Sequence, residues 1–160
     1  MASFDDFLAC FETVEPPFTI TEETVGLLEK NEPIPEIFVD EFLSQWELEH
    51  DEFSEYVAIL KLPAQKEYEA IIYWKASLLK YEYILVTSKD GNLVSRKIIS
   101  AKIIEGDIIK SSAARIDHDL IIYIMAGVAF DIDHYDPTLS QQFSMEIMEN
   151  GEIIFTVDDE

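Results

Sequence analysis

Residues 81–104, YEYILVTSKDGNLVSRKIISAKII, decide the fold class of this chain. Apolar and β-branched residues fill both ends of the stretch, and Asp90-Gly91-Asn92 separates them. Gly and Asn tolerate the positive φ angles of a tight hairpin turn. The stretch therefore predicts two antiparallel strands, Tyr81–Thr87 and Leu93–Ile104, joined by that turn.

The same alternation with a period of two extends over the whole chain from Ser54 onward. Asn150-Gly151 marks a second hairpin near the end of the chain. No spacing typical of β-α-β units occurs, so we do not expect a parallel sheet. We expect about seven or eight strands, at Tyr56–Leu62, Tyr68–Ala76, Tyr81–Thr87, Leu93–Ile104, Asp107–Ala114, Leu120–Asp131, Phe143–Met148 and a closing strand at Glu152–Val157.

The first 50 residues follow helical spacing instead. We expect three short helices, at Phe4–Thr13, from Thr21 to about Asn31, and from Pro35 to about Trp46. Acids near each start suit a helix N-terminus, and Pro residues follow the first two helices. Cys10 lies between Phe7 and Phe11 on the first helix, where we expect a buried packing residue rather than a nucleophile.

These elements predict an α+β fold in which N-terminal short helices pack on a curved antiparallel β-meander. We expect residues 1–160 to form one domain, with an acidic helical part at 1–53 and the sheet at 54–160. Two predicted strands, 70–74 and 120–125, are apolar on both faces. Central strands between two layers and strands at the contact of a homo-oligomer both show this pattern, and the sequence leaves the two interpretations open.

The charge of the chain is strongly negative and unevenly distributed. Its 160 residues hold 33 Asp and Glu against 11 Lys and Arg, a formal net charge of -22. Residues 1–53 have a net charge of -14, residues 54–116 of +3, and residues 117–160 of -11. Such a chain repels phosphate groups, so we expect no nucleic acid and no membrane among its partners.

The sequence lacks a pair of cysteines for a disulfide, a signal peptide and a membrane-spanning stretch, and these features bear on the cellular location. Cys10 is the only cysteine, which excludes an intramolecular disulfide. Acids stand where a signal peptide has Lys or Arg. The longest uncharged apolar stretch, residues 120–130, falls short of the roughly 20 residues of a membrane-spanning helix. We therefore expect a cytoplasmic protein.

Ligand-type side chains are concentrated in one region, at Asp117, His118, Asp131, Asp133 and His134. Carboxylates and imidazoles bind divalent metal ions, so a divalent metal is the one cofactor for which the sequence offers ligands. A continuous strand over residues 120–131 would hold the two groups about 40 Å apart, unless Gly127 breaks it. Solvated turn residues explain the same pattern more simply. No sequence motif of a common enzyme class is present.

The charge pattern favours a non-catalytic interaction module that binds a basic protein partner. We expect the contact to involve Glu47, Glu49, Asp51 and Glu52. Ile34-Pro35 followed by Phe42-Leu43 resembles the Leu-Pro and Phe-Leu elements of the SMI1/KNR4-type immunity proteins, although the Asn-Gly-Gly that usually follows there is absent. An immunity-type inhibitor of a basic toxin is one form of this hypothesis. The alternative is a small-molecule or metal-dependent enzyme that uses the Asp and His residues at 117–136.

Overall fold

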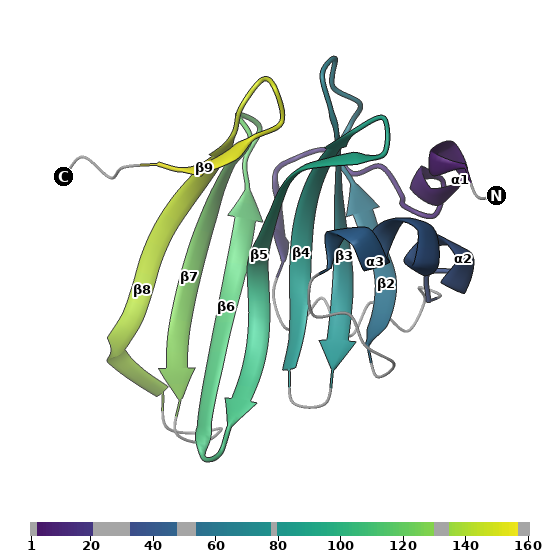
Figure 1. Cartoon of the computed structure of the whole chain (residues 1–160). Coiled ribbons are helices and arrows are strands. Elements are labelled where there is room, and N and C mark those ends of the chain that lie inside the picture. The colour runs from purple at the N-terminus through teal and green to yellow at the C-terminus, as the bar shows by residue number, and fades with distance from the viewer. Residues whose placement is uncertain (1–2, 21–32, 48–53, 78–79, 130–134, 157–160) are drawn as a thin grey trace.

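One antiparallel sheet dominates the computed structural model, which describes residues 3–20, 33–47, 54–77, 80–129 and 135–156 (Figure 1). Eight strands form a meander in which each strand pairs with the next one in the chain. The predicted α+β class with an antiparallel meander is confirmed. The strands of the meander are β2 (Glu55–Lys61), β3 (Glu69–Ser77), β4 (Lys80–Lys89), β5 (Asn92–Glu105), β6 (Ile108–Ile116), β7 (Ile121–Ala129), β8 (Tyr135–Ile147) and β9 (Ile153–Phe155).

Both predicted hairpins are present, and their turns have the backbone that the residues favour. Asp90 and Gly91 have φ angles of 52° and 87° between β4 and β5, as a two-residue hairpin turn requires. Gly151 has a φ of 94° between β8 and β9. A Cβ atom at this position would lie 3.0 Å from the Cβ of Tyr68, so the turn needs glycine for both conformation and space.

A short strand near the N-terminus, β1 (Phe18–Ile20), joins the sheet and was not predicted. It pairs with residues 114–116 of β6. The pairing between β5 and β6 ends at Ala101 and Ser112, so β1 takes the place beside β6 that β5 has left. The sheet is therefore divided into two halves that meet at β5, β6 and β1.

The first core, which we call the sheet-sheet core, lies between these two halves. Ile72 and Leu85 from β3 and β4 are buried in the same cluster as Ile122 and Met145 from β7 and β8. Two hydrogen bonds bring the last hairpin back to β4 and β5: the Thr87 hydroxyl donates to the Gly151 carbonyl at 2.5 Å, and the Ile153 amide donates to the Ser95 hydroxyl at 3.0 Å. The meander is thus curled around its own apolar residues.

The second core, which we call the helix-sheet core, lies on the opposite face of β2, β3 and β4, under the N-terminal helices (Figure 1). Phe7 of α1 (Phe4–Leu8) is fully buried there against Phe11 and Phe42. The helix predicted over residues 4–13 ends at Leu8 instead. As a result Cys10 lies outside the helix and is exposed, which corrects the expectation that it is buried.

The helix predicted from Pro35 to Trp46 is confirmed in extent but not in regularity. It consists of α2 (Glu36–Phe38), a π-helical turn η2 (Val39–Leu43) and α3 (Ser44–Trp46). The Ser44 hydroxyl and the Gln45 amide donate to the carbonyls of Asp40 and Glu41, at 2.6 and 2.9 Å. These bonds satisfy carbonyl groups where the helical ladder is irregular. The helix predicted to start at Thr21 lies outside the described residues.

The two strands that the sequence shows as apolar on both faces have different environments. On β3, Ile72 faces the sheet-sheet core and Tyr73 faces the helix-sheet core, so both faces are covered. On β7, Ile122 and Ile124 are buried, whereas Tyr123 and Met125 are 46% and 54% exposed. β3 is thus a central strand between layers, and β7 is covered on one face only. Within the described ranges, no helix is long and apolar enough to cross a membrane.

Candidate functional site

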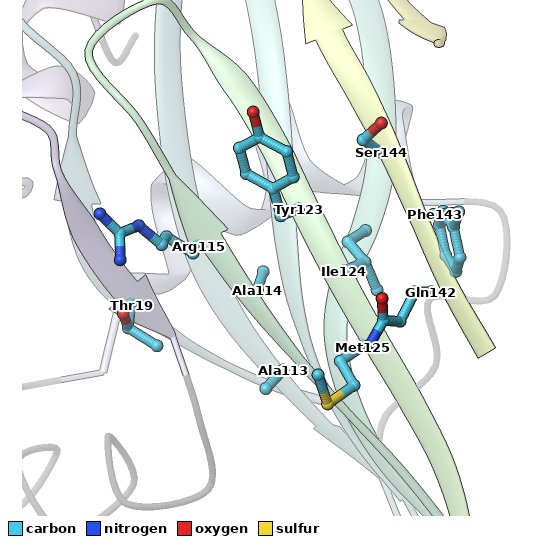
Figure 2. Close-up of a pocket in the computed structure, with 10 residues that line it drawn as sticks. All are labelled: Thr19, Ala113, Ala114, Arg115, Tyr123, Ile124, Met125, Gln142, Phe143 and Ser144. Carbon is cyan, nitrogen blue, oxygen red and sulfur yellow. The ribbon is translucent and has the colours of Figure 1, made fainter. Parts of the chain in front are cut away.

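A hollow lies on the face of β6, β7 and β8 that points away from the sheet-sheet core, which we call the outer face (Figure 2). Its volume is about 440 Å³. Ala113 of β6 and Tyr123 and Met125 of β7 present their side chains on this face, whereas the neighbouring Ala114 is buried in the sheet-sheet core. Arg115 borders the hollow and forms an exposed ion pair with Asp117, with 2.8 Å between Nε and Oδ1. The hollow is therefore mostly apolar.

A larger groove of about 1140 Å³ lies at the end of the molecule where three loops meet. They are the β2–β3 connection, the β6–β7 turn and the β8–β9 hairpin. Met148 and Ile154 expose 37% and 43% of their area along it. Five carboxylates and one lysine surround these apolar side chains, and we call this site the acidic groove: Glu67, Asp119, Glu146, Glu149, Glu152 and Lys66.

The backbone of the acidic groove is held by local hydrogen bonds. Leu120 has a φ of 63°, an unusual conformation for a residue with a branched side chain. Its amide donates to the carbonyl of Asp117 at 2.9 Å, and its carbonyl accepts from Ile147 at 3.1 Å. The Asp119 carboxylate accepts from the amide of Ile121 at 3.2 Å. The β6–β7 turn is thus fixed to β8, and the groove is built on a defined backbone.

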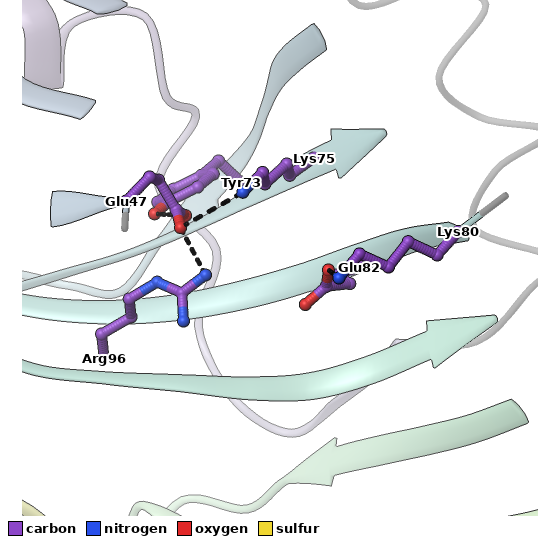
Figure 3. Close-up of polar contacts among 6 residues, drawn as sticks. All are labelled: Glu47, Tyr73, Lys75, Lys80, Glu82 and Arg96. Atoms are coloured by element: carbon purple, nitrogen blue, oxygen red, sulfur yellow. Dashed lines mark hydrogen bonds and ion pairs between the residues drawn. The ribbon is translucent and has the colours of Figure 1, made fainter. Parts of the chain in front are cut away.

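Glu47, the first of the predicted partner-binding acids, is buried under the helical layer (Figure 3). Its Oε1 accepts a hydrogen bond of 2.5 Å from the Tyr73 hydroxyl. Its Oε2 accepts from the Arg96 guanidinium and lies 3.7 Å from Nζ of Lys75. One carboxylate at the end of α3 therefore joins the helical layer to β3 and β5, and its charge is used inside the chain.

Two effects set the pKa values in this buried cluster: the loss of water around its groups and the negative charge of Glu47. Burial raises the pKa of Tyr73 well above its usual value, and the nearby negative charge of Glu47 raises it further. Burial alone would lower the pKa of Arg96, but the hydrogen bond to Glu47 and the charge of Glu47 outweigh it and raise the pKa. The phenol stays protonated and the guanidinium stays charged, so the cluster acts as a structural anchor.

The other predicted partner-binding acids, Glu49, Asp51 and Glu52, lie outside the described residues. The correction for Glu47 has a simple physical cause. Its partners, Tyr73, Lys75 and Arg96, come from strands that follow it in the chain by 26 to 49 residues. In the sequence, Glu47 stands near other acids and far from these partners. The sequence alone therefore predicts a solvated side chain.

Only two of the predicted metal ligands, Asp117 and His118, lie in the described part of the chain. Asp117 is engaged by Arg115, and His118 is exposed in the β6–β7 turn. Asp131, Asp133 and His134 lie outside the described residues. β7 continues through Gly127 in its ladder with β6, but its pairing with β8 shifts register between Ala126 and Val128, so Gly127 marks an irregularity without ending the strand. Among the described residues, no group of three His, Cys, Asp or Glu side chains is placed to hold a metal ion.

The acidic groove was missed from the sequence because its acids are distributed over three loops. Asn150-Gly151 and Asp117-His118-Asp119 are recognisable as turns, and turn acids are usually solvated singly. Only the curl of the sheet brings the β8–β9 hairpin close to the β2–β3 connection. No protein-family model matches the chain, and no curated protein or solved structure shows significant similarity to it.

Proposed function

We propose that this chain is a binding module that recognises a basic segment of another protein through its acidic groove. The observation that carries the proposal is the lining of the groove, where carboxylates surround the exposed side chains of Met148 and Ile154. Lys and Arg side chains in a partner would pair with the groove carboxylates other than Glu67, which pairs with Lys89 of the chain itself, and an apolar side chain beside them would cover the exposed apolar area.

The use of charge elsewhere in the molecule supports the proposal. At least six of the ten Lys and Arg residues between 54 and 116 form ion pairs with other described residues. The described residues of the helical layer, 3–20 and 33–47, hold eight acids and no Lys or Arg. The molecule therefore presents a negative surface that accelerates the encounter with a positive partner. The six paired bases are Lys75, Lys80, Lys89, Arg96, Lys110 and Arg115.

The proposed contact differs from the one expected at Glu47, because that carboxylate is buried. Glu49, Asp51 and Glu52 stay in the proposal as a second acidic segment. A module of this kind neutralises a basic protein by covering its positive surface. An immunity-type inhibitor of a basic toxin is one form of this activity.

The test compares two triple variants that change net charge equally. One variant removes groove acids, Glu146→Gln, Glu149→Gln and Glu152→Gln. The other removes exposed acids outside the groove, Glu12→Gln, Glu36→Gln and Glu55→Gln. Each protein is immobilised, and basic proteins from the source cells are captured at 50 mM and 0.5 M NaCl and quantified by mass spectrometry.

We expect the wild type and the control variant to retain the same basic protein at 50 mM salt. The groove variant should retain at least about tenfold less, because several charge pairs are lost together. At 0.5 M salt the Debye length is only a few Å, so retention should fall for all three proteins. Equal retention by the two variants would mean that net charge alone attracts basic proteins, which contradicts a groove-specific site.

A further inference from the structure

We infer that Thr87 is a positioning residue for the acidic groove, because it fastens the β8–β9 hairpin to β4. This inference rests on the proposed function of the groove. The lining of the groove comes from both halves of the sheet: the β2–β3 connection belongs to one half, and the β6–β7 turn and the β8–β9 hairpin belong to the other. Among the described strands, β9 pairs only with β8. The width of the groove therefore depends on how the hairpin docks on the opposite half.

The Thr87 hydroxyl makes a buried contact between the two halves beside the groove. Thr87 lies on β4 and is fully buried, and its hydroxyl donates to the carbonyl of Gly151 in the turn of the β8–β9 hairpin. A second bond lies close to it, where the amide of Ile153 donates to the Ser95 hydroxyl of β5. Both bonds hold the backbone of the hairpin, so they set the position of every side chain that the hairpin presents.

The β8–β9 hairpin moves as one unit because its own hydrogen bonds are closed. The amide of Met148 donates to the carbonyl of Glu152 at 2.8 Å, and the amide of Gly151 donates to the carbonyl of Met148 at 2.9 Å. The Asn150 side chain accepts from the amide of Glu152 at 3.0 Å. Release of the turn from β4 would therefore displace the groove residues of the hairpin together, namely Met148, Glu149, Glu152 and Ile154.

The opposite wall of the groove contacts the same turn. Tyr68 lines the groove from the β2–β3 connection and is 4% exposed. Its Cβ lies 3.0 Å from the place of a Cβ atom at Gly151, so the turn rests directly on this side chain. Gly151 is buried, and a buried carbonyl that loses its donor is costly. Without the Thr87 hydroxyl, this carbonyl is best solvated when the turn moves outward, and that movement widens the groove.

Three variants of equal net charge test the inference in the capture assay at 50 mM NaCl. Thr87→Val removes the hydroxyl and keeps the branched shape of the side chain, whereas Thr87→Ser keeps the hydroxyl and loses a methyl group. Ile84→Val removes one methylene group from the helix-sheet core, so it lowers stability without touching the groove.

We expect Thr87→Val to retain at least about fivefold less of the basic protein than the wild type, because a buried acceptor is left unpaired. Thr87→Ser and Ile84→Val should retain it within about twofold of the wild type, since the first keeps the donor and the second acts at a distant site. A role of Thr87 in stability alone would instead lower retention equally in all three variants, which contradicts the inference.

Hydrogen exchange at the Ile153 amide reports the docking of the hairpin without any partner, because this amide donates to Ser95. We expect the amide to exchange at least about fivefold faster in Thr87→Val than in Ile84→Val, and Thr87→Ser should restore slow exchange. Exchange in Thr87→Val that is no faster than in Ile84→Val overturns the positioning role.

The triple groove variant described above separates the two proposals. Equal retention by that variant and its charge-matched control contradicts the proposed function of the groove. Full retention by Thr87→Val beside a clear loss in the groove variant leaves the proposed function in place and contradicts the positioning role alone.

Discussion

Replacing the buried carboxylate of Glu47 tests whether the ion cluster anchors the helical layer. Glu47→Gln keeps the shape of the side chain and removes its charge. Lys75 is then left buried without an opposite charge, and Arg96 loses the partner of its guanidinium. Removing one member of a buried ion pair costs about 3–5 kcal/mol. The Arg96 side chain is 26% exposed, so water partly solvates its charge, and we expect about 3 kcal/mol for this variant.

The assay is urea unfolding followed by tryptophan fluorescence, because Trp46 is buried beside Glu47 in the helix-sheet core. In thermal unfolding, a loss of about 3 kcal/mol from the free energy of unfolding of a chain of this length lowers Tm by roughly 6–12 °C. Glu82→Gln is the matched control, since Glu82 is also buried but pairs with Lys80, whose side chain is 34% exposed. We expect this control to lose about 1 kcal/mol.

A second substitution separates loss of charge balance from a packing defect. Lys75→Met in the Glu47→Gln background removes the stranded cation and replaces it with an apolar side chain of similar length. We expect it to recover part of the lost stability, because apolar replacement of buried charges is often neutral or favourable. A loss below about 1 kcal/mol for Glu47→Gln, or no recovery in the double variant, would refute the anchoring role.

Three further predictions concern titration and the backbone. Because burial and Glu47 raise the pKa of Tyr73 in the folded protein, the stability that its protonated phenol contributes is complete below about pH 10 and is lost as the pH rises further; urea midpoints from pH 8 to 11.5 should fall less steeply for Tyr73→Phe than for the wild type. Burial and the nearby Asp90 raise the pKa of Glu69, whose Oε2 is buried without a hydrogen-bond partner among the described residues. The ionised form is therefore the unfavourable one, and Glu69→Gln should increase the free energy of unfolding at pH 7 by less than about 1 kcal/mol, because water partly screens the carboxylate, and give no increase at pH 3, where the carboxyl is protonated in both states. Gly151→Ala should lower the free energy of unfolding by roughly 1–3 kcal/mol in the same assay, because alanine is strained at a φ of 94° and its Cβ would press on Tyr68; an unchanged value would show that the hairpin shifts without penalty.

Most of the strands were predictable from the sequence because their causes are local, although β8 begins at Tyr135 and not at the expected Phe143. Alternating apolar residues and turn residues such as Asp90-Gly91 act over a few neighbours, and the observed φ angles at that turn agree with this origin. The helix from Glu36 to Trp46 was predictable for the same reason, apart from its π-helical turn. The acidic character of the helical layer also follows directly from the residues present.

The remaining features depend on residues far apart in the chain. β1 has only three residues and lies beside β6 because β5 leaves a place there. Glu47 is buried because Tyr73 and Arg96 meet it from other strands. The acidic groove needs three loops that only the curled sheet assembles. Local spacing contains no information on these contacts, so they could not be predicted.

The pairing of β1 with β6 also determines the order in which this chain can be completed during synthesis. Phe18–Ile20 reach their partners, residues 114–116, only after nearly a hundred further residues have been made. Among the described residues, the helix-sheet core extends no further along the chain than Val86, so its apolar side chains can gather while the ribosome is still producing β6. Contacts between such distant residues form slowly. We therefore expect β1 to be among the last strands to gain protection from hydrogen exchange during refolding, after β3 and β4.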